Sequence, residues 1–151
     1  MRKILYALLF FALSTSLLAS DPFAGTWKLN SEKTRYKTGA PPKEVTVVME
    51  EQGDQLHVTV TGMHDDGSPL SVKYSVPVKG GMGMVETGDF NSVRLKVIGK
   101  NTREFQYLKD GKEIRMRRMV VSEDGKTMQT TMTGTNALGK QVSGTDFFDR
   151  Q

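Results

Sequence analysis

Cysteine is absent from the sequence, and histidine and tryptophan are scarce, with two histidines and one tryptophan. Without cysteine the chain forms neither a disulfide framework nor a lipid-modified cysteine. His57 alternates with apolar neighbours and is predicted to face solvent, while His64 precedes two aspartates in a solvated turn, so we expect no metal or haem site. No G-x-S-x-G motif, Walker loop or nucleophile–base spacing occurs. We therefore expect a protein that is not an enzyme and uses no cofactor.

Long apolar runs are also absent after the first 20 residues. Two basic residues near the start precede an apolar stretch at Ile4–Leu18, and small residues follow before Asp21. This is the layout of a secretory signal peptide, which is too short and wrongly flanked for a stable membrane anchor. We expect residues 1–20 to be removed and residues 21–151 to form one domain, periplasmic or secreted, with no transmembrane segment.

An excess of positive charge is missing from the predicted mature chain. Removal of residues 1–20 leaves 19 basic against 17 acidic residues, because the segment carries two basic residues and no acidic one. A net charge of about +2 gives no support to nucleic-acid binding. The remaining length, about 130 residues, suffices for one domain with a real core. We expect a monomer.

Alternation of apolar and polar residues runs through most of the mature chain and predicts β-strands. Residues 31–43 interrupt it with glycine and a proline pair, and are predicted to form a loop with one helical turn near Ser31–Tyr36. The predicted strands are 23–30, 45–50, 56–61, 70–79, 84–87, 93–97, 105–107, 113–122, 127–135 and 141–150.

Short turns join the strands of the last third, at Asp110-Gly111, Asp124-Gly125 and Leu138-Gly139. Such turns connect antiparallel hairpins and leave no room for crossover helices. A meander of many sequential strands removes its exposed edges by closing on itself. We therefore predict an all-β fold, a single antiparallel up-and-down β-barrel of roughly 8–10 strands. A two-sheet sandwich is the alternative.

The stretch Phe23–Asn30, with the sequence FAGTWKLN, resembles the first strand of the calycins. This superfamily comprises lipocalins, fatty-acid-binding proteins and avidins, and its signature Gly-x-Trp corresponds here to Gly25 and Trp27. The ending Gly144–Arg150 is similar in spacing to the last strand of the fatty-acid-binding branch. The resemblance implies a barrel in which Arg150 packs across the ring of Trp27 and caps nearby backbone carbonyls.

Two features differ from the fatty-acid-binding branch. Residues 31–43 are too short and too rich in proline and glycine for its two-helix lid. Its carboxylate-binding arginine and tyrosine correspond here to Asp146 and Phe148, and an aspartate repels a fatty-acid carboxylate. The chain is therefore more similar to bacterial lipocalin-like proteins whose ligand is unassigned.

Polar residues fall on the predicted inner faces of the last three strands. Arg118 and Asp146 lie on strands separated by one neighbour, roughly 10 Å apart across the sheet, with Thr130 between them. A charge inside a barrel is costly unless it is paired, so we expect a polar cluster that contacts the polar end of a ligand. The alternative is the opposite strand phase, which places Arg118 outside with Arg115 and Arg117 on a solvated strand.

Methionines form a second group on the predicted inner faces, at Met49, Met116, Met128 and Met132. Their unbranched, polarizable side chains suit an adaptable apolar pocket. They suit an irregular core without a ligand equally well.

The sequence thus predicts an exported lipocalin-like barrel that binds a small hydrophobic or amphipathic molecule in its lumen. The mouth is predicted to be framed by residues 31–43 and 80–90. The alternative is a lumen filled by side chains and an outer surface that binds a protein, as calycin-type proteinase inhibitors do. The predicted ligand contacts are Arg118, Asp146, Tyr74, Phe105, Tyr107, Met116, Met128, Thr130, Met132 and Phe148.

Overall fold

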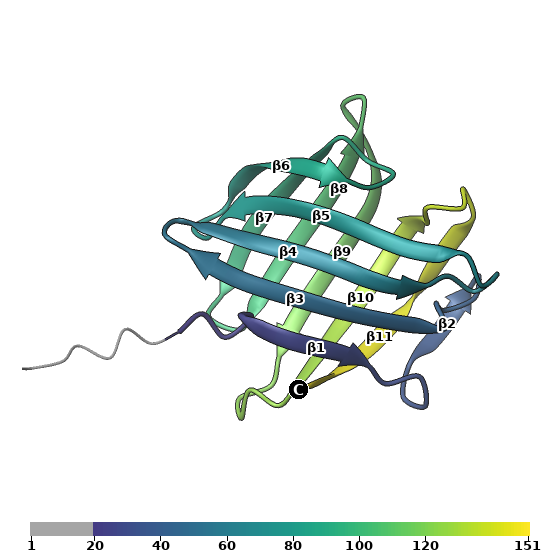
Figure 1. The fold of residues 1–151 in the computed structure, drawn as a ribbon, viewed down its shortest axis with the longest axis horizontal. Helices are drawn as coiled ribbons and strands as arrows, with labels where there is room; N and C mark the ends of the chain where they lie inside the picture. The colour runs from purple at the N-terminus through teal and green to yellow at the C-terminus, as the bar shows by residue number, and fades with distance from the viewer. Residues whose placement is uncertain (1–19) are drawn as a thin grey trace, which may run out of the picture.

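The computed structural model describes residues 20–151, which form eleven β-strands and no helix (Figure 1). This part of the chain therefore contains no helix long and apolar enough to cross a membrane. The signal peptide predicted at residues 1–20 lies, apart from Ser20, outside the described residues. The strands are β1 (Gly25–Leu29), β2 (Arg35–Thr38), β3 (Glu44–Gln52), β4 (Gln55–Met63), β5 (Pro69–Pro77), β6 (Gly81–Thr87), β7 (Ser92–Gly99), β8 (Thr102–Lys109), β9 (Lys112–Val121), β10 (Thr127–Thr135) and β11 (Gln141–Arg150).

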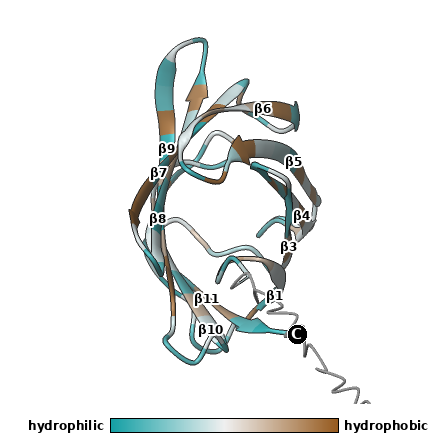
Figure 2. Cartoon of the chain, turned by 90° about the vertical axis from the view of Figure 1, so that its left-hand side faces the viewer, coloured by the Kyte–Doolittle hydropathy of each residue, from teal (hydrophilic) through white to brown (hydrophobic). Residues whose placement is uncertain are grey.

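Ten of these strands form a closed antiparallel barrel, which Figure 2 shows as a ring. From β3 to β11 each strand pairs with the next along the chain, and β1 pairs with both β3 and β11. The short strand β2 lies outside this ring and pairs with the free part of β11 next to β1. The predicted all-β, up-and-down antiparallel barrel is confirmed, and the sandwich is excluded.

Apolar rows from most strands of the ring point into the lumen, because successive side chains of a strand point to opposite faces. In β3 and β4 the inward residues are those predicted from the alternation, and the same holds for β5, β10 and β11. The buried residues of these strands include Val45, Val47, Met49, Leu56, Val58, Val72, Tyr74, Val76, Met128, Met132, Val142 and Phe148.

The predicted Asp-Gly turn at Asp110-Gly111 joins β8 to β9. Asp110 has a φ of 51° and Gly111 a φ of 78°, as a two-residue hairpin turn of the primed type requires. The turns predicted at Asp124-Gly125 and Leu138-Gly139 join β9 to β10 and β10 to β11. The last three strands are thus consecutive hairpins, as expected.

Three segments differ from the prediction, and one of them is β8, which begins at Thr102, three residues earlier than predicted. The loop predicted at residues 31–43 contains β2, which is held by its pairing with β11 rather than by an apolar stripe of its own. Strand β6 begins at Gly81, three residues earlier than predicted. At Gly83 a Cβ atom would lie 2.1 Å from the Ser75 carbonyl oxygen, so glycine lets β6 approach β5 closely.

Aromatic side chains plug one end of the barrel. Trp27 and Phe23 are fully buried, and the Trp27 indole N–H donates to the Phe23 carbonyl over 2.9 Å. The guanidinium of Arg150 lies 4.1 Å from the Trp27 ring centroid, a contact that stabilises by about 0.5–2 kcal/mol. The predicted Trp27–Arg150 pair is confirmed, and Arg150 also donates to the carbonyls of Pro22, Ala24 and Gly125.

A second arginine completes this plugged end. Arg103 forms a buried ion pair with Asp21, and its guanidinium lies 4.4 Å from the Phe23 ring centroid. The Asp21 carboxylate also accepts a hydrogen bond from the Phe23 N–H over 2.8 Å. The plugged end is therefore defined by Asp21, Phe23, Trp27, Arg103 and Arg150.

Candidate functional site

A cavity lies at the opposite end of the barrel. Its lining includes His64 and Asp65 after β4, Asp89 after β6, and Asn136 after β10, and these loops lie at the strand ends away from Trp27. The cavity volume is about 80 Å³, counted as the space open to the centre of a water molecule. We call this end of the barrel the mouth.

Apolar side chains make up most of the cavity wall, as in small-molecule sites generally. They come from the inward faces of β3, β4, β5, β9, β10 and β11 and from Phe90 in the β6–β7 loop, so much of a bound molecule would contact apolar surface. The apolar lining residues include Val45, Val47, Val58, Val60, Leu70, Val72, Phe90, Met119, Met128, Met132, Val142 and Phe148.

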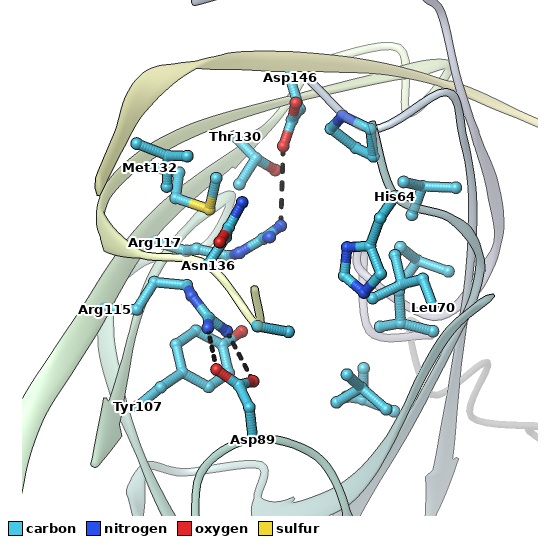
Figure 3. A pocket seen from close by; sticks show the side chains of 18 of the residues that line it. His64, Leu70, Asp89, Tyr107, Arg115, Arg117, Thr130, Met132, Asn136 and Asp146 are labelled. Atoms are coloured by element: carbon cyan, nitrogen blue, oxygen red, sulfur yellow. Dashed lines mark hydrogen bonds and ion pairs between the residues drawn. The ribbon is translucent and has the colours of Figure 1, made fainter. Parts of the chain in front are cut away.

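An ion pair between Arg117 of β9 and Asp146 of β11 lies in this wall (Figure 3). The guanidinium Nη1 is 3.7 Å from the carboxylate Oδ2, and the Asp146 side chain is 2% exposed. Burial raises the pKa of Asp146, and the positive charge of Arg117 opposes that shift. The carboxylate is thus held in a poorly solvated place, with Arg117 beyond hydrogen-bond distance and the Tyr36 hydroxyl as a second neighbour that lowers its pKa.

Three buried polar atoms beside this pair have no hydrogen-bond partner among the described residues. They are the Tyr36 hydroxyl, the Thr130 hydroxyl and Oδ1 of Asp146. Burial, and next the Asp146 carboxylate, raise the pKa of Tyr36, so its hydroxyl keeps its proton. Each unsatisfied buried group costs about 1–3 kcal/mol. Such a cluster inside a cavity is suited to a polar group of a bound molecule.

A second arginine of β9 is fully engaged. Arg115 contacts both carboxylate oxygens of Asp89, at 3.4 and 2.5 Å, and donates from Nε to the Thr135 carbonyl over 2.8 Å. Its guanidinium also lies 5.6 Å from the ring centroid of Tyr107, whose hydroxyl is 3.0 Å from that of Tyr74. This side of the wall is therefore polar but satisfied, and it fixes the loop after β6.

His64 and Asp65 lie at the mouth, where we expected a solvated hairpin tip. Both residues are half-buried and line the cavity, and Asp65 forms an ion pair with Lys140 over 3.1 Å. The pair connects the β4–β5 and β10–β11 loops across the mouth. Residues 20–151 contain no group of three or more histidine, aspartate or glutamate side chains arranged to hold a metal ion.

Two predicted inward residues of β9 point outward instead. Arg118 is exposed and pairs with Glu104 over 2.7 Å on the outer surface, and Met116 shares its face and does not line the cavity. The predictions that Arg118 and Met116 face the lumen are therefore wrong. Thr130 of β10 pairs with Met119, which fixes the phase of β9 and turns Arg117 inward.

Most other predicted contacts do lie around the cavity. Phe105 is fully buried in the core but is not among the lining residues. Residues from both predicted mouth segments, 31–43 and 80–90, contribute to the wall. The exposed Met82 and Met84 of β6 do not. The predicted contacts that line the cavity are Tyr74, Tyr107, Met128, Thr130, Met132, Asp146 and Phe148.

Sequence reasoning missed several polar lining residues, among them Tyr36, Arg115 and Arg117. Arg117 lies two and four residues before Met119 and Val121, and this spacing is the sequence signal that places Arg117 on the same face as those two apolar residues. Nothing local marks Tyr36, because its contact with the cavity depends on the pairing of β2 with β11.

No known family's sequence profile matches the chain, and no curated protein matches it. Among solved structures it is similar to apocrustacyanin C2, with a TM-score of 0.45, and to apocrustacyanin C1, with 0.46. Each is 14% identical, and the match covers 90% of this chain and 64% of the other. The fold itself is a closed ten-stranded antiparallel barrel with Trp27 in the first strand covered by Arg150 from the last, as the sequence resemblance to calycins implied.

Proposed function

We propose that this protein is an exported, non-enzymatic barrel that binds a small amphipathic molecule at its mouth. One observation carries the proposal: a cavity with a mostly apolar wall contains buried polar atoms that no described residue satisfies. Each such atom lowers the stability of the unliganded protein, so a bound molecule that supplies the missing hydrogen bonds is favoured.

The apolar wall suits the body of the molecule. Burial of apolar surface stabilises a complex by about 25 cal/mol per Å² before the costs of association are subtracted. Met119, Met128 and Met132 line the same space, and methionine side chains adapt to irregular shapes. The wall therefore favours a hydrophobic or amphipathic ligand over a strongly polar one.

Purification from the native compartment, followed by native mass spectrometry, tests the proposal. We expect a co-purified molecule and a measured mass that lacks residues 1–20. A full-length mass in the cytoplasmic fraction would contradict export. The absence of any bound molecule, together with no thermal shift across a panel of lipids and hydrophobic dyes, would contradict ligand binding.

A blocked cavity gives the matched control. Val60 lines the cavity, whereas Thr61 is exposed on the opposite face of the same strand. We expect Val60→Phe to abolish the thermal shift given by any binding dye, and Thr61→Phe to leave it unchanged. Equal shifts in both variants would place dye binding elsewhere on the protein.

A protein-binding barrel remains the second candidate because of apolar side chains on the outer surface. Met82 and Met84 of β6 are 49% and 77% exposed, and Val97 and Ile98 of β7 are 42% and 41% exposed. This candidate predicts that Met84→Lys removes a partner captured from the native extract. It also predicts that Val60→Phe leaves that partner bound.

A further inference from the structure

The three unsatisfied groups of the cavity come from three neighbouring strands. Thr130 of β10 lies directly opposite Asp146 of β11, and Tyr36 of β2 lies opposite Gly144, two residues from Asp146. A Cβ atom at Gly144 would lie 2.3 Å from the Tyr36 ring, so glycine allows the ring to lie against β11. The strand pairing therefore brings the phenol, the threonine hydroxyl and the carboxylate together.

The hydrogen-bonding capacity of these groups is complementary to one chemical group. Oδ1 of Asp146 is an acceptor and the Tyr36 and Thr130 hydroxyls are donors, and none has a partner at hydrogen-bond distance, although the Tyr36 hydroxyl lies close enough to the Asp146 carboxylate to lower its pKa. A hydroxyl group offers one donated proton and two lone pairs, which match one acceptor and two donors. A carboxylate offers acceptors only and leaves Oδ1 without a donor, while an ammonium offers donors only and gives the two hydroxyl protons no acceptor.

The charges around the cavity also disfavour an ionised ligand. Arg117 is paired with Asp146, and Arg115 with Asp89, so the inner wall carries two positive and two negative groups. At the rim, Asp65 is already paired with Lys140. An anion would lie beside the Asp146 carboxylate and a cation beside the Arg117 guanidinium. Neither gains a free countercharge in return for its lost hydration.

We propose that Tyr36, Thr130 and Asp146 bind an uncharged hydroxyl group, so that the ligand is an alcohol with an apolar body. This rests on the proposed binding of a small amphipathic molecule at the mouth. Asp146 Oδ1 accepts the ligand O–H, and the Tyr36 and Thr130 hydroxyls donate to the ligand oxygen. The apolar body lies along the valine and methionine side chains of the wall.

Probes that differ only in their polar end test this assignment. Displacement of a neutral dye, Nile red, is measured at pH 7 with 1-octanol, octanoate and octylammonium. We expect octanol to displace the dye at a concentration about tenfold lower than either ion, because only the alcohol satisfies all three groups. Octanoate or octylammonium binding as tightly as octanol would overturn the hydroxyl assignment while leaving ligand binding intact. If neither the dye nor any probe binds, the proposed function itself is overturned.

Paired variants on one strand give a second readout. Thr130→Val removes the buried hydroxyl with little change in shape, and Thr131→Val makes the same change on the exposed face. We expect Thr130→Val to weaken octanol binding about three- to tenfold. Nile red affinity should not change. The unliganded protein should not lose stability, because the removed hydroxyl has no partner.

The control and a second variant keep the test falsifiable. Thr131→Val should change neither octanol affinity nor the unfolding midpoint. Tyr36→Phe removes the other unsatisfied hydroxyl and should repeat the behaviour of Thr130→Val. A merely structural Thr130 would lower the unfolding midpoint and weaken octanol and Nile red equally, which would overturn the proposal.

Discussion

The two ends of the barrel use arginine differently. At the plugged end, the guanidinium groups of Arg103 and Arg150 lie over the rings of Phe23 and Trp27. At the mouth, Arg115 and Arg117 pair with carboxylates beside an open space. Both ends combine ion pairs with aromatic contacts, since Arg103 also pairs with Asp21 and Arg115 also lies over Tyr107. The difference is that buried aromatic rings fill the plugged end, while the mouth keeps open space beside its polar groups.

Unsatisfied polar atoms occur both at the plugged end and at the mouth, and what differs is whether they lie beside the cavity. Arg103 has two nitrogens without a hydrogen-bond partner among the described residues, but it is not among the cavity's lining residues. Tyr36, Thr130 and Asp146 are all lining residues. The comparison teaches that stability and binding are separated along the barrel axis: substitutions at the plugged end should act on folding, and substitutions at the mouth on ligand affinity.

The largest effect is expected at the centre of the plug. Trp27→Ala should lower the free energy of unfolding by about 3–5 kcal/mol, because it removes a fully buried indole and leaves a cavity. Denaturant titration followed by circular dichroism measures this, since the variant lacks tryptophan fluorescence. Trp27→Phe should recover part of the loss. A Trp27→Ala loss below about 1 kcal/mol would contradict the role of Trp27 as a plug.

The ion pair beneath the plug comes next. Arg103→Ala should lower the free energy of unfolding by about 3 kcal/mol, because the Asp21 carboxylate is left buried without its counterion. This loss of unfolding free energy should be equal without octanol and with saturating octanol, because octanol stabilises the wild type and the variant by the same amount. An Arg103→Ala protein that folds normally but has lost octanol binding would reverse the assignment of the two ends.

A smaller, pH-dependent effect is expected from Asp146, whose pKa burial raises above 3.8. The native state then binds this proton more tightly than the unfolded chain does. Protonation therefore favours folding below the unfolded pKa, and this contribution is lost as the pH rises through the raised native pKa. Relative to Asp146→Asn, the wild-type protein should lose stability as the pH rises from about 4, by at most about 1.4 kcal/mol per pH unit.

Denaturant titrations of both proteins at several pH values measure this difference. Taking the difference removes the other carboxyl groups, among them Asp66 and Asp124, whose pKa values are lowered by hydrogen bonds and which act in the opposite direction. A difference that is independent of pH, or that grows in favour of the wild type as the pH rises, would show that the Asp146 pKa is not raised.

The smallest effect is expected from Arg118, which neighbours Arg117 in the sequence but lies outside the barrel. Arg118→Ala should change the free energy of unfolding by less than about 1 kcal/mol, because its pair with Glu104 is solvent-exposed. Octanol affinity should not change. A substantial loss of octanol binding in Arg118→Ala would support the inward orientation that the strand pairing contradicts.

The sequence contained enough to predict the barrel and part of the mouth. Strands β10 and β11 each carry a clean period of two, so Met128, Thr130, Asp146 and Phe148 were placed correctly on the inner face. The Trp27–Arg150 contact was predicted from the resemblance of the first and last strands to those of calycins.

Strand β9 could not be oriented from its own residues. Ile114, Met116 and Val120 offer an apolar row in one phase, while Met119 and Val121 offer one in the other. The choice is made by pairing with β10 and by the irregular register at Tyr107 and Leu108 of β8. Both are long-range properties of the sheet, which no local period records.

Chemical-shift mapping of the ¹⁵N-labelled protein during titration with 1-octanol tests the separation of the two ends most directly. We predict saturable shifts at the backbone amides of Tyr36, Thr130 and Asp146. The amides of Phe23 and Trp27 and the indole N–H of Trp27 should not shift. Saturable shifts centred on Phe23 and Trp27, with none at the mouth, would contradict the assignment of binding to the mouth and of stability to the plug.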